Sequence, residues 1–168
     1  MSILQLLRKP AQDRLPRVLR AMETLIMNEQ VKHTERDREL DYEYDHIREA
    51  VKYAKSLALK RKIDPDIAGT VAAVQNIASI VTGRNEDHAD AGYYPAKEFL
   101  KTLDCFSAKE IEQIAVAVRN HSRKSEKDAP LDELAKDADI YARYCQGHEF
   151  SRPHDLARLS RLRIELEF

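Results

Sequence analysis

Side chains of the kinds that bind transition metals accompany the apolar stripes of several predicted helices. They are His46, His88, His121 and Asp139. His46 lies four residues before Ala50, at the edge of one stripe, and His121 extends the row that contains Val118. Imidazole nitrogens and a carboxylate held by rigid helices suit a transition metal. Singly, each is more often an ordinary core or surface residue, so the prediction rests on their order along the chain.

Two adjacent amides, Gln75 and Asn76, interrupt the most apolar stretch of the chain, VAAVQNIASI at residues 71–80. A buried amide must hydrogen-bond, bind a ligand or face a cavity, because leaving its hydrogen bonds unmade costs free energy. The pair is therefore a second candidate feature of the same site.

Helices must position these residues. Gly (4) and Pro (6) are scarce among the 168 residues, the chain is 43% hydrophobic and 34% charged, and no convincing alternating strand is found. We expect an all-α fold. The predicted helices are a short one from Ser2 to Pro10, then 16–31, 42–62, 65–80, 88–103, one behind a capping box at Ser107–Glu110, 131–146 and 153–167. The charged stretch KHTERDRELDYEYD is interpreted as a linker or as a solvated start of the helix at 42–62.

Four segments in this order resemble the HD superfamily of metal-dependent phosphohydrolases, whose motif is His, then His-Asp, then Asp. They are DHIREAVKYAKSLALKRKIDPDIAGTVAAV with His46, HADAGYYPAKEFL, IEQIAVAVRNHS, and DADIYAR with Asp139. The resemblance covers residues 41–146. It departs from the family at the doublet, where Gln75 stands at the His position and Asn76 at the Asp position.

The resemblance implies a single HD-type helical bundle of about six to seven helices. Within it, residues 1–40 form an N-terminal helical extension that packs on the core, 41–146 the HD-like domain and 147–168 a C-terminal helix. The resemblance also implies a divalent metal bound by His46, His88, His121 and Asp139, with Asn76 and Gln75 as weaker ligands. Such a His-rich set suits Fe, Mn, Zn or Ni, and no organic cofactor is expected.

Three functional hypotheses follow. The first is a phosphohydrolase with an altered metal site, in which the metal activates water for attack on a phosphate ester or nucleotide. The second is a catalytically inactive HD fold that binds a phosphorylated ligand or a protein. The third is a structural helical module in which Gln75 and Asn76 hydrogen-bond His46 and Asp139 in place of a metal.

Basic side chains near the candidate ligands are candidates for phosphate binding. They are Arg84, Lys97, Arg119, Arg123 and Lys124. Arginine and lysine match phosphate oxygens in charge and hydrogen bonding. The alternative is that these residues belong to solvated loops.

The expected partner is a small phosphorylated molecule or nucleotide. The net charge of −1 argues against nucleic acid, and no stretch approaches the roughly 20 apolar residues that span a membrane. The helix at 153–167 is expected to pack on the domain or to form a homodimer contact. The absence of a signal-peptide pattern, with Cys105 and Cys145 interpreted as reduced thiols, predicts a cytoplasmic protein.

Overall fold

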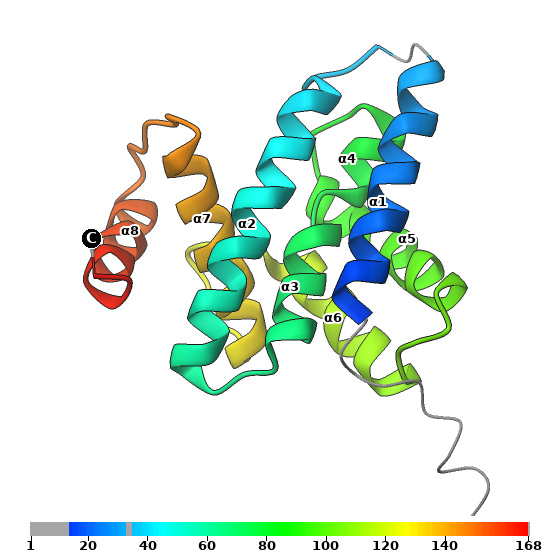
Figure 1. The fold of residues 1–168 in the computed structure, drawn as a ribbon. Coiled ribbons are helices and arrows are strands. Elements are labelled where there is room, and N and C mark those ends of the chain that lie inside the picture. Colours follow the sequence, from blue (N-terminus) through cyan, green and yellow to red (C-terminus); the bar gives the residue numbers. More distant parts are fainter. Residues whose placement is uncertain (1–13, 33–34, 168) are drawn as a thin grey trace, which may run out of the picture.

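The computed structural model describes residues 14–32 and 35–167, which contain helices and no strand. The helices are α1 (Arg14–Val31), α2 (Leu40–Arg61), α3 (Pro65–Val74), α4 (Ile77–Thr82), α5 (His88–Thr102), α6 (Ala108–Asn120), α7 (Pro130–Cys145) and α8 (Pro153–Glu165) (Figure 1). The all-α class is therefore confirmed. The helix expected from Ser2 to Pro10 lies outside the described residues.

Local sequence signals account for where several helices begin. Before α3, the Asp64 side chain accepts hydrogen bonds from the backbone N–H groups of Asp66 and Ile67, and Pro65 occupies the first turn. The predicted capping box before α6 is confirmed, since the Ser107 and Glu110 side chains each accept from the other's backbone N–H.

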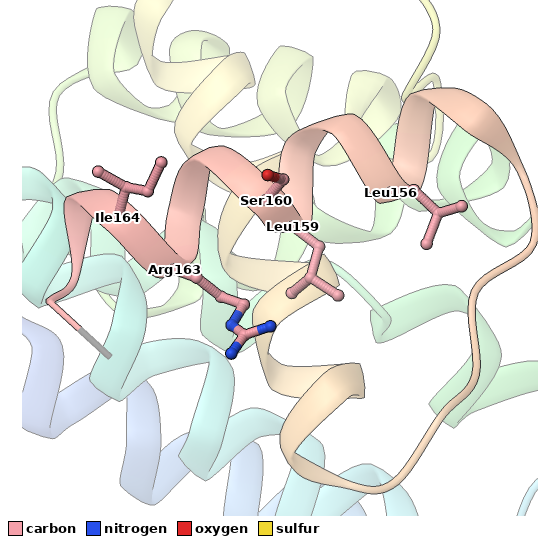
Figure 2. A pocket seen from close by; sticks show the side chains of 5 residues that line it. All are labelled: Leu156, Leu159, Ser160, Arg163 and Ile164. Carbon is pink, nitrogen blue, oxygen red and sulfur yellow. The ribbon is translucent and has the colours of Figure 1, made fainter.

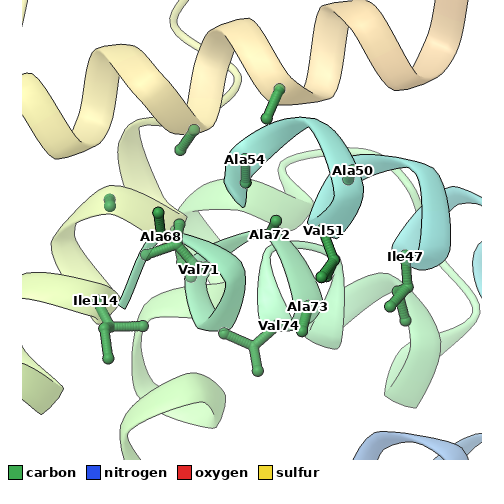
Figure 3. Packing of buried hydrophobic residues seen from close by; sticks show 14 of the residues in the cluster. Ile47, Ala50, Val51, Ala54, Ala68, Val71, Ala72, Ala73, Val74 and Ile114 are labelled. Carbon is green, nitrogen blue, oxygen red and sulfur yellow. The ribbon is translucent and has the colours of Figure 1, made fainter. Parts of the chain in front are cut away.

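Helix α3 is the centre of the fold and packs against α1, α2, α6 and α7. Figure 1 shows α1 on one side of α3, with α2 and then α7 and α8 on the other. Small side chains allow the close approach of α2 and α3, because Ala50 and Ala54 of α2 and Ala68 and Ala72 of α3 are all buried there (Figure 3).

One predicted helix is divided in two. The apolar run at 65–80 predicts a continuous helix, but α3 ends at Val74 and α4 begins at Ile77. Gln75 and Asn76 form the turn between them, and Asn76 leaves helical geometry with φ −102° and ψ 17°. The prediction of one helix was wrong because apolar periodicity continues through the turn. The break directs the two amide side chains to different partners: the Gln75 amide lies against His46, and the Asn76 amide donates to Glu43.

Helix α8 lies at the edge of the bundle (Figure 1). Leu156, Leu159, Ser160, Arg163 and Ile164 line a shallow depression of about 430 Å³ along it (Figure 2). None of these residues was predicted to be part of the site. No helix in the described ranges is long and apolar enough to cross a membrane, and no disulfide joins Cys105 to Cys145.

Candidate functional site

The residues predicted to carry chemistry come from separate helices that meet around the α3–α4 turn. His46 lies on the inner face of α2, His121 follows the last residue of α6, and Asp139 lies in the middle of α7. All three are buried, as are Gln75 and Asn76 in the turn. His88 is the first residue of α5 and is partly buried.

His46 and Asp139 form the first half of the site. His46 Nε2 lies 3.2 Å from Asp139 Oδ1 and 3.0 Å from Gln75 Nε2. His46 Nδ1 donates to Gln146 Oε1 at 2.8 Å. In the neutral imidazole, Nε2 then accepts from the Gln75 amide, and in the protonated form it donates to Asp139. The predicted hydrogen bond between Gln75 and His46 is confirmed, and both ring nitrogens have partners within the protein.

Lys124 occupies an unexpected position in this half. Its Nζ lies 2.6 Å from Asp139 Oδ2 and also donates to the backbone oxygen of His121. Both side chains are buried. Burial alone would raise the pKa of Asp139, but attraction to Lys124 and the hydrogen bond from His46 together hold that pKa well below its usual range. Burial lowers the pKa of Lys124, and Asp139 opposes that effect. Asp139 is therefore a carboxylate whose charge is already balanced by an internal cation.

Asn76 has a partner that the sequence reasoning missed. Its Nδ2 donates to Glu43 Oε2 at 2.9 Å, and the Ser79 hydroxyl donates to Glu43 Oε1 at 3.2 Å. The hypothesis that Asn76 bonds Asp139 was wrong, because the turn directs Asn76 toward the start of α2. Glu43 was assigned to a charged linker or solvated helix start, yet it is buried. Its spacing of three residues before His46 places both on one face of α2 and could have identified it.

His88 and His121 form the second half of the site, with their Nε2 atoms 3.2 Å apart. Each ring donates its Nδ1 proton to a backbone oxygen, of Asn85 at 2.8 Å and of Val118 at 2.6 Å. Each Nε2 therefore carries a lone pair when the ring is neutral. Burial, and then the Lys124 charge, lower the pKa of His121 to about 3. Burial also lowers the pKa of His88. Two neutral rings would thus direct their lone pairs at each other.

The donor atoms do not fit the predicted metal as they are arranged. Both oxygens of Asp139 and both ring nitrogens of His46 have protein partners. Within the described part of the chain, no group of three or more His, Cys, Asp and Glu side chains is placed to hold a metal ion. The His88–His121 pair has the spacing that two ligand nitrogens need and lies 3.2 Å apart, because two nitrogens bound tetrahedrally at zinc-like distances lie about 3.3 Å apart. His46 Nε2 and Asp139 Oδ1 lie equally close, but each is already engaged by protein partners.

Most of the predicted phosphate-binding side chains have carboxylate partners. Arg84 pairs with Asp37, Lys97 with Glu112, Arg123 with Asp90, and Lys124 with Asp139. Arg119 instead lies over the Tyr93 ring, 5.1 Å from its centroid. Their role in phosphate binding stays a prediction, and four of the five cations are already neutralised.

Comparison with known proteins gives a family match and a structural match. A family model described as the HD domain matches residues 44–144. A predicted HD superfamily hydrolase from an uncultured Thermotogales bacterium superposes with a TM-score of 0.55, covering 100% of this chain and 95% of the other at 20% identity. At that identity the structural match supports the fold alone. No curated protein matches the sequence significantly.

Proposed function

The chain belongs to the HD-domain family, and from that premise we propose that it binds a phosphorylated small molecule without the family's metal-centred hydrolysis. The observation that supports the proposal most directly is the buried ion pair between Lys124 Nζ and Asp139 Oδ2 at 2.6 Å. HD domains generally bind divalent metals. In the sequence resemblance, Asp139 is the carboxylate that stands at the family's last motif position. In this chain a lysine ammonium neutralises that carboxylate.

A metal ion at Asp139 would have to displace Lys124 from its partner. The displaced ammonium would lose both Asp139 and the His121 backbone oxygen while still enclosed by protein. Leaving one member of a buried ion pair unpaired costs about 3–5 kcal/mol. The doublet position offers no compensation, because Gln75 and Asn76 are neutral amides without the charge that offsets a divalent cation. The ligand class follows from the phosphohydrolase-type superfamily.

A second candidate function is a hydrolase with one metal bound by the His88–His121 pair. The observation that favours it is the 3.2 Å separation of two Nε2 atoms whose rings are fixed by backbone hydrogen bonds. Asn76 Oδ1 and Gln75 Oε1 are buried without hydrogen-bond partners, so an amide oxygen is also free to act as a weak ligand. Such a site would use the histidines of the second half and leave His46 hydrogen-bonded.

Metal loading separates the two candidates. The protein is incubated with Mn²⁺, Fe²⁺, Zn²⁺ or Ni²⁺, desalted and analysed for metal, in wild type, Lys124→Met and the matched surface variant Lys127→Met. We expect no retained metal in wild type or Lys127→Met, and retained metal in Lys124→Met, where Asp139 becomes available to join His88 and His121. Metal retained by wild type and lost in His88→Ala would instead favour the second candidate.

Activity assays complete the test. A panel of phosphate monoesters, diesters and nucleotides is offered to wild-type protein with and without each metal. The proposal expects no metal-dependent cleavage and expects thermal stabilisation by at least one phosphorylated compound in the presence of EDTA. Cleavage that requires a metal and is lost in His121→Ala would contradict it.

A further inference from the structure

Two half-buried arginines beside the site, Arg38 and Arg143, have no carboxylate partner in the described residues. Arg38, just before α2, lies over the Tyr42 ring at 5.3 Å, and Arg143 of α7 lies over the Phe150 ring at 5.2 Å. The Arg143 Nε atom is buried and has no hydrogen-bond partner. Unlike Arg123, which is paired with Asp90, these guanidinium groups retain unbalanced positive charge.

Tyr42 and His148 connect the two arginines. The Tyr42 hydroxyl lies 2.9 Å from His148 Nε2, within hydrogen-bond distance, and the two rings meet edge to face. Burial lowers the pKa of His148, and the positive charges of Arg143 and Arg38 lower it further. Arg38 contacts the Tyr42 ring, and the His148 backbone N–H donates to the Arg143 backbone oxygen at 3.0 Å. The two arginines therefore flank the Tyr42–His148 pair, although they come from opposite ends of the domain sequence.

This cluster adjoins the buried site. The Tyr42 ring stacks on the His46 ring at 6.0 Å between centroids and 17° between planes. Gln146, which accepts from His46, also donates to the Tyr42 backbone oxygen at 3.4 Å. Through its backbone hydrogen bond with His148, Arg143 belongs to the same cluster. The arginines thus border the His46 half of the site, on the side where Tyr42 and His148 are only partly buried.

We propose that Arg38 and Arg143 bind the phosphate group of the ligand, with Tyr42 and His148 as neighbouring hydrogen-bonding groups. The inference rests on the proposed function and names the residues that recognise the anion. Guanidinium groups bind phosphate oxygens in pairs of parallel hydrogen bonds, and an arginine stacked on an aromatic ring is already oriented for this. A phosphate group has enough negative charge and enough oxygens to bind both arginines at once. A single carboxylate has only one charge and two oxygens.

The test measures binding of inorganic phosphate by isothermal titration and thermal shift at constant ionic strength, once in EDTA and once with added Mn²⁺. The variants are Arg38→Gln, Arg143→Gln and Arg143→Lys, with Arg48→Gln as the control, since Arg48 is an exposed arginine of α2. We expect Arg38→Gln and Arg143→Gln each to weaken binding at least about tenfold, Arg143→Lys to weaken it less, and Arg48→Gln to leave it unchanged. Melting without phosphate and circular dichroism establish that each variant is folded.

The outcomes separate this inference from the proposed function. If wild type binds phosphate in EDTA and the arginine variants bind equally well, the inference is overturned and metal-free binding stands. If binding disappears in EDTA but, with metal present, still depends on Arg38 and Arg143, the inference stands and metal-free binding fails. If wild type does not bind phosphate under either condition, the inference is overturned.

Discussion

The two halves of the site differ in how their polar atoms are satisfied. Around His46 and Asp139, every ring nitrogen and carboxylate oxygen has a partner, and Lys124 supplies the balancing positive charge. Around His88 and His121, the outer nitrogens are fixed by backbone oxygens, but the inner Nε2 atoms face each other at 3.2 Å. The first half is complete within the protein, whereas in the second half the two Nε2 atoms lie against each other, with the Ser122 hydroxyl 3.4 Å from His121 Nε2.

The difference shows how one fold can keep the position of a metal site and change what fills it. A buried carboxylate needs positive charge nearby, which either a bound metal or a lysine can provide. Once lysine provides it, the doublet is no longer required to carry charge, and neutral amides at positions 75 and 76 hydrogen-bond to His46 and Glu43 instead.

The largest expected effect is that of removing the carboxylate from the completed half. Asp139→Ala leaves the Lys124 ammonium buried without its ion-pair partner, and we expect a loss of about 3–5 kcal/mol in the free energy of unfolding. Urea denaturation measures it. The control is Asp90→Ala, which breaks an ion pair of 2.7 Å whose side chains are exposed, and its expected cost is about 0–1 kcal/mol. Equal losses in both variants would show that Lys124 does not depend on Asp139.

Acidification should lower the stability of the protein mainly through His121, in the second half of the site. The folded-state pKa of His121 is lowered to about 3, so the unfolded chain takes up the proton first as the pH falls below its ordinary value of about 6.5. The neutral histidine contributes stability that is present above about pH 6.5 and lost toward pH 3. We expect a loss of about 3 kcal/mol between pH 6.5 and 4, at about 1.4 kcal/mol per pH unit. If the free energy of unfolding of His121→Asn falls with decreasing pH as steeply as that of wild type, other groups cause the acid sensitivity.

A smaller effect is expected at Asn76, the amide that stands at the Asp position of the family doublet. Asn76→Ala removes the hydrogen bond to the buried Glu43 carboxylate, which keeps the Ser79 hydroxyl. The expected cost is about 1–3 kcal/mol, because one oxygen of a buried charged group loses its donor. Thermal denaturation of wild type, Asn76→Ala and Asn76→Asp measures the effect of each side chain on stability. Asn76→Asp should be the less stable, since two carboxylates would then meet without a cation. An Asn76→Asp variant more stable than wild type would indicate that a cation binds there.

The smallest effect is expected at a paired surface arginine. Arg84→Gln breaks an ion pair with Asp37 whose side chains are 63% and 39% exposed, so the free energy of unfolding should change by less than about 0.5 kcal/mol. Phosphate-dependent stabilisation should stay within about twofold of wild type, in contrast to Arg143→Gln. A loss of phosphate binding in Arg84→Gln would restore the sequence-based prediction that Arg84 is a phosphate ligand.

Local chemistry in the sequence predicted most of the fold. Apolar spacing and caps such as Ser107 located the helices to within a few residues, because those signals act over three or four positions. The division at Gln75–Asn76 was missed, since apolar side chains lie on both sides of the turn. Residue order identified His46, Asp139 and the histidine pair as neighbours of one region.

The partners of these residues could not be predicted in the same way. Lys124 follows a polar loop pattern, and nothing local indicates that its ammonium enters the core to meet Asp139. Arg38 and Arg143 are 105 residues apart. The packing of α2 against α7 brings them together through Tyr42, which Arg38 contacts, and His148, which bonds to the Arg143 backbone. Long flexible side chains find their partners through tertiary packing, which short sequence patterns do not encode.

Metal content after loading tests the central statement, that Lys124 takes the place of the metal, most directly. Wild-type protein and Lys124→Met are saturated with Mn²⁺ or Zn²⁺, desalted and analysed by mass spectrometry of the intact chain under native conditions. The predicted result is a metal-free wild type and a Lys124→Met variant that retains one ion. A wild type that retains one ion per chain, with Lys124 still in place, would contradict it.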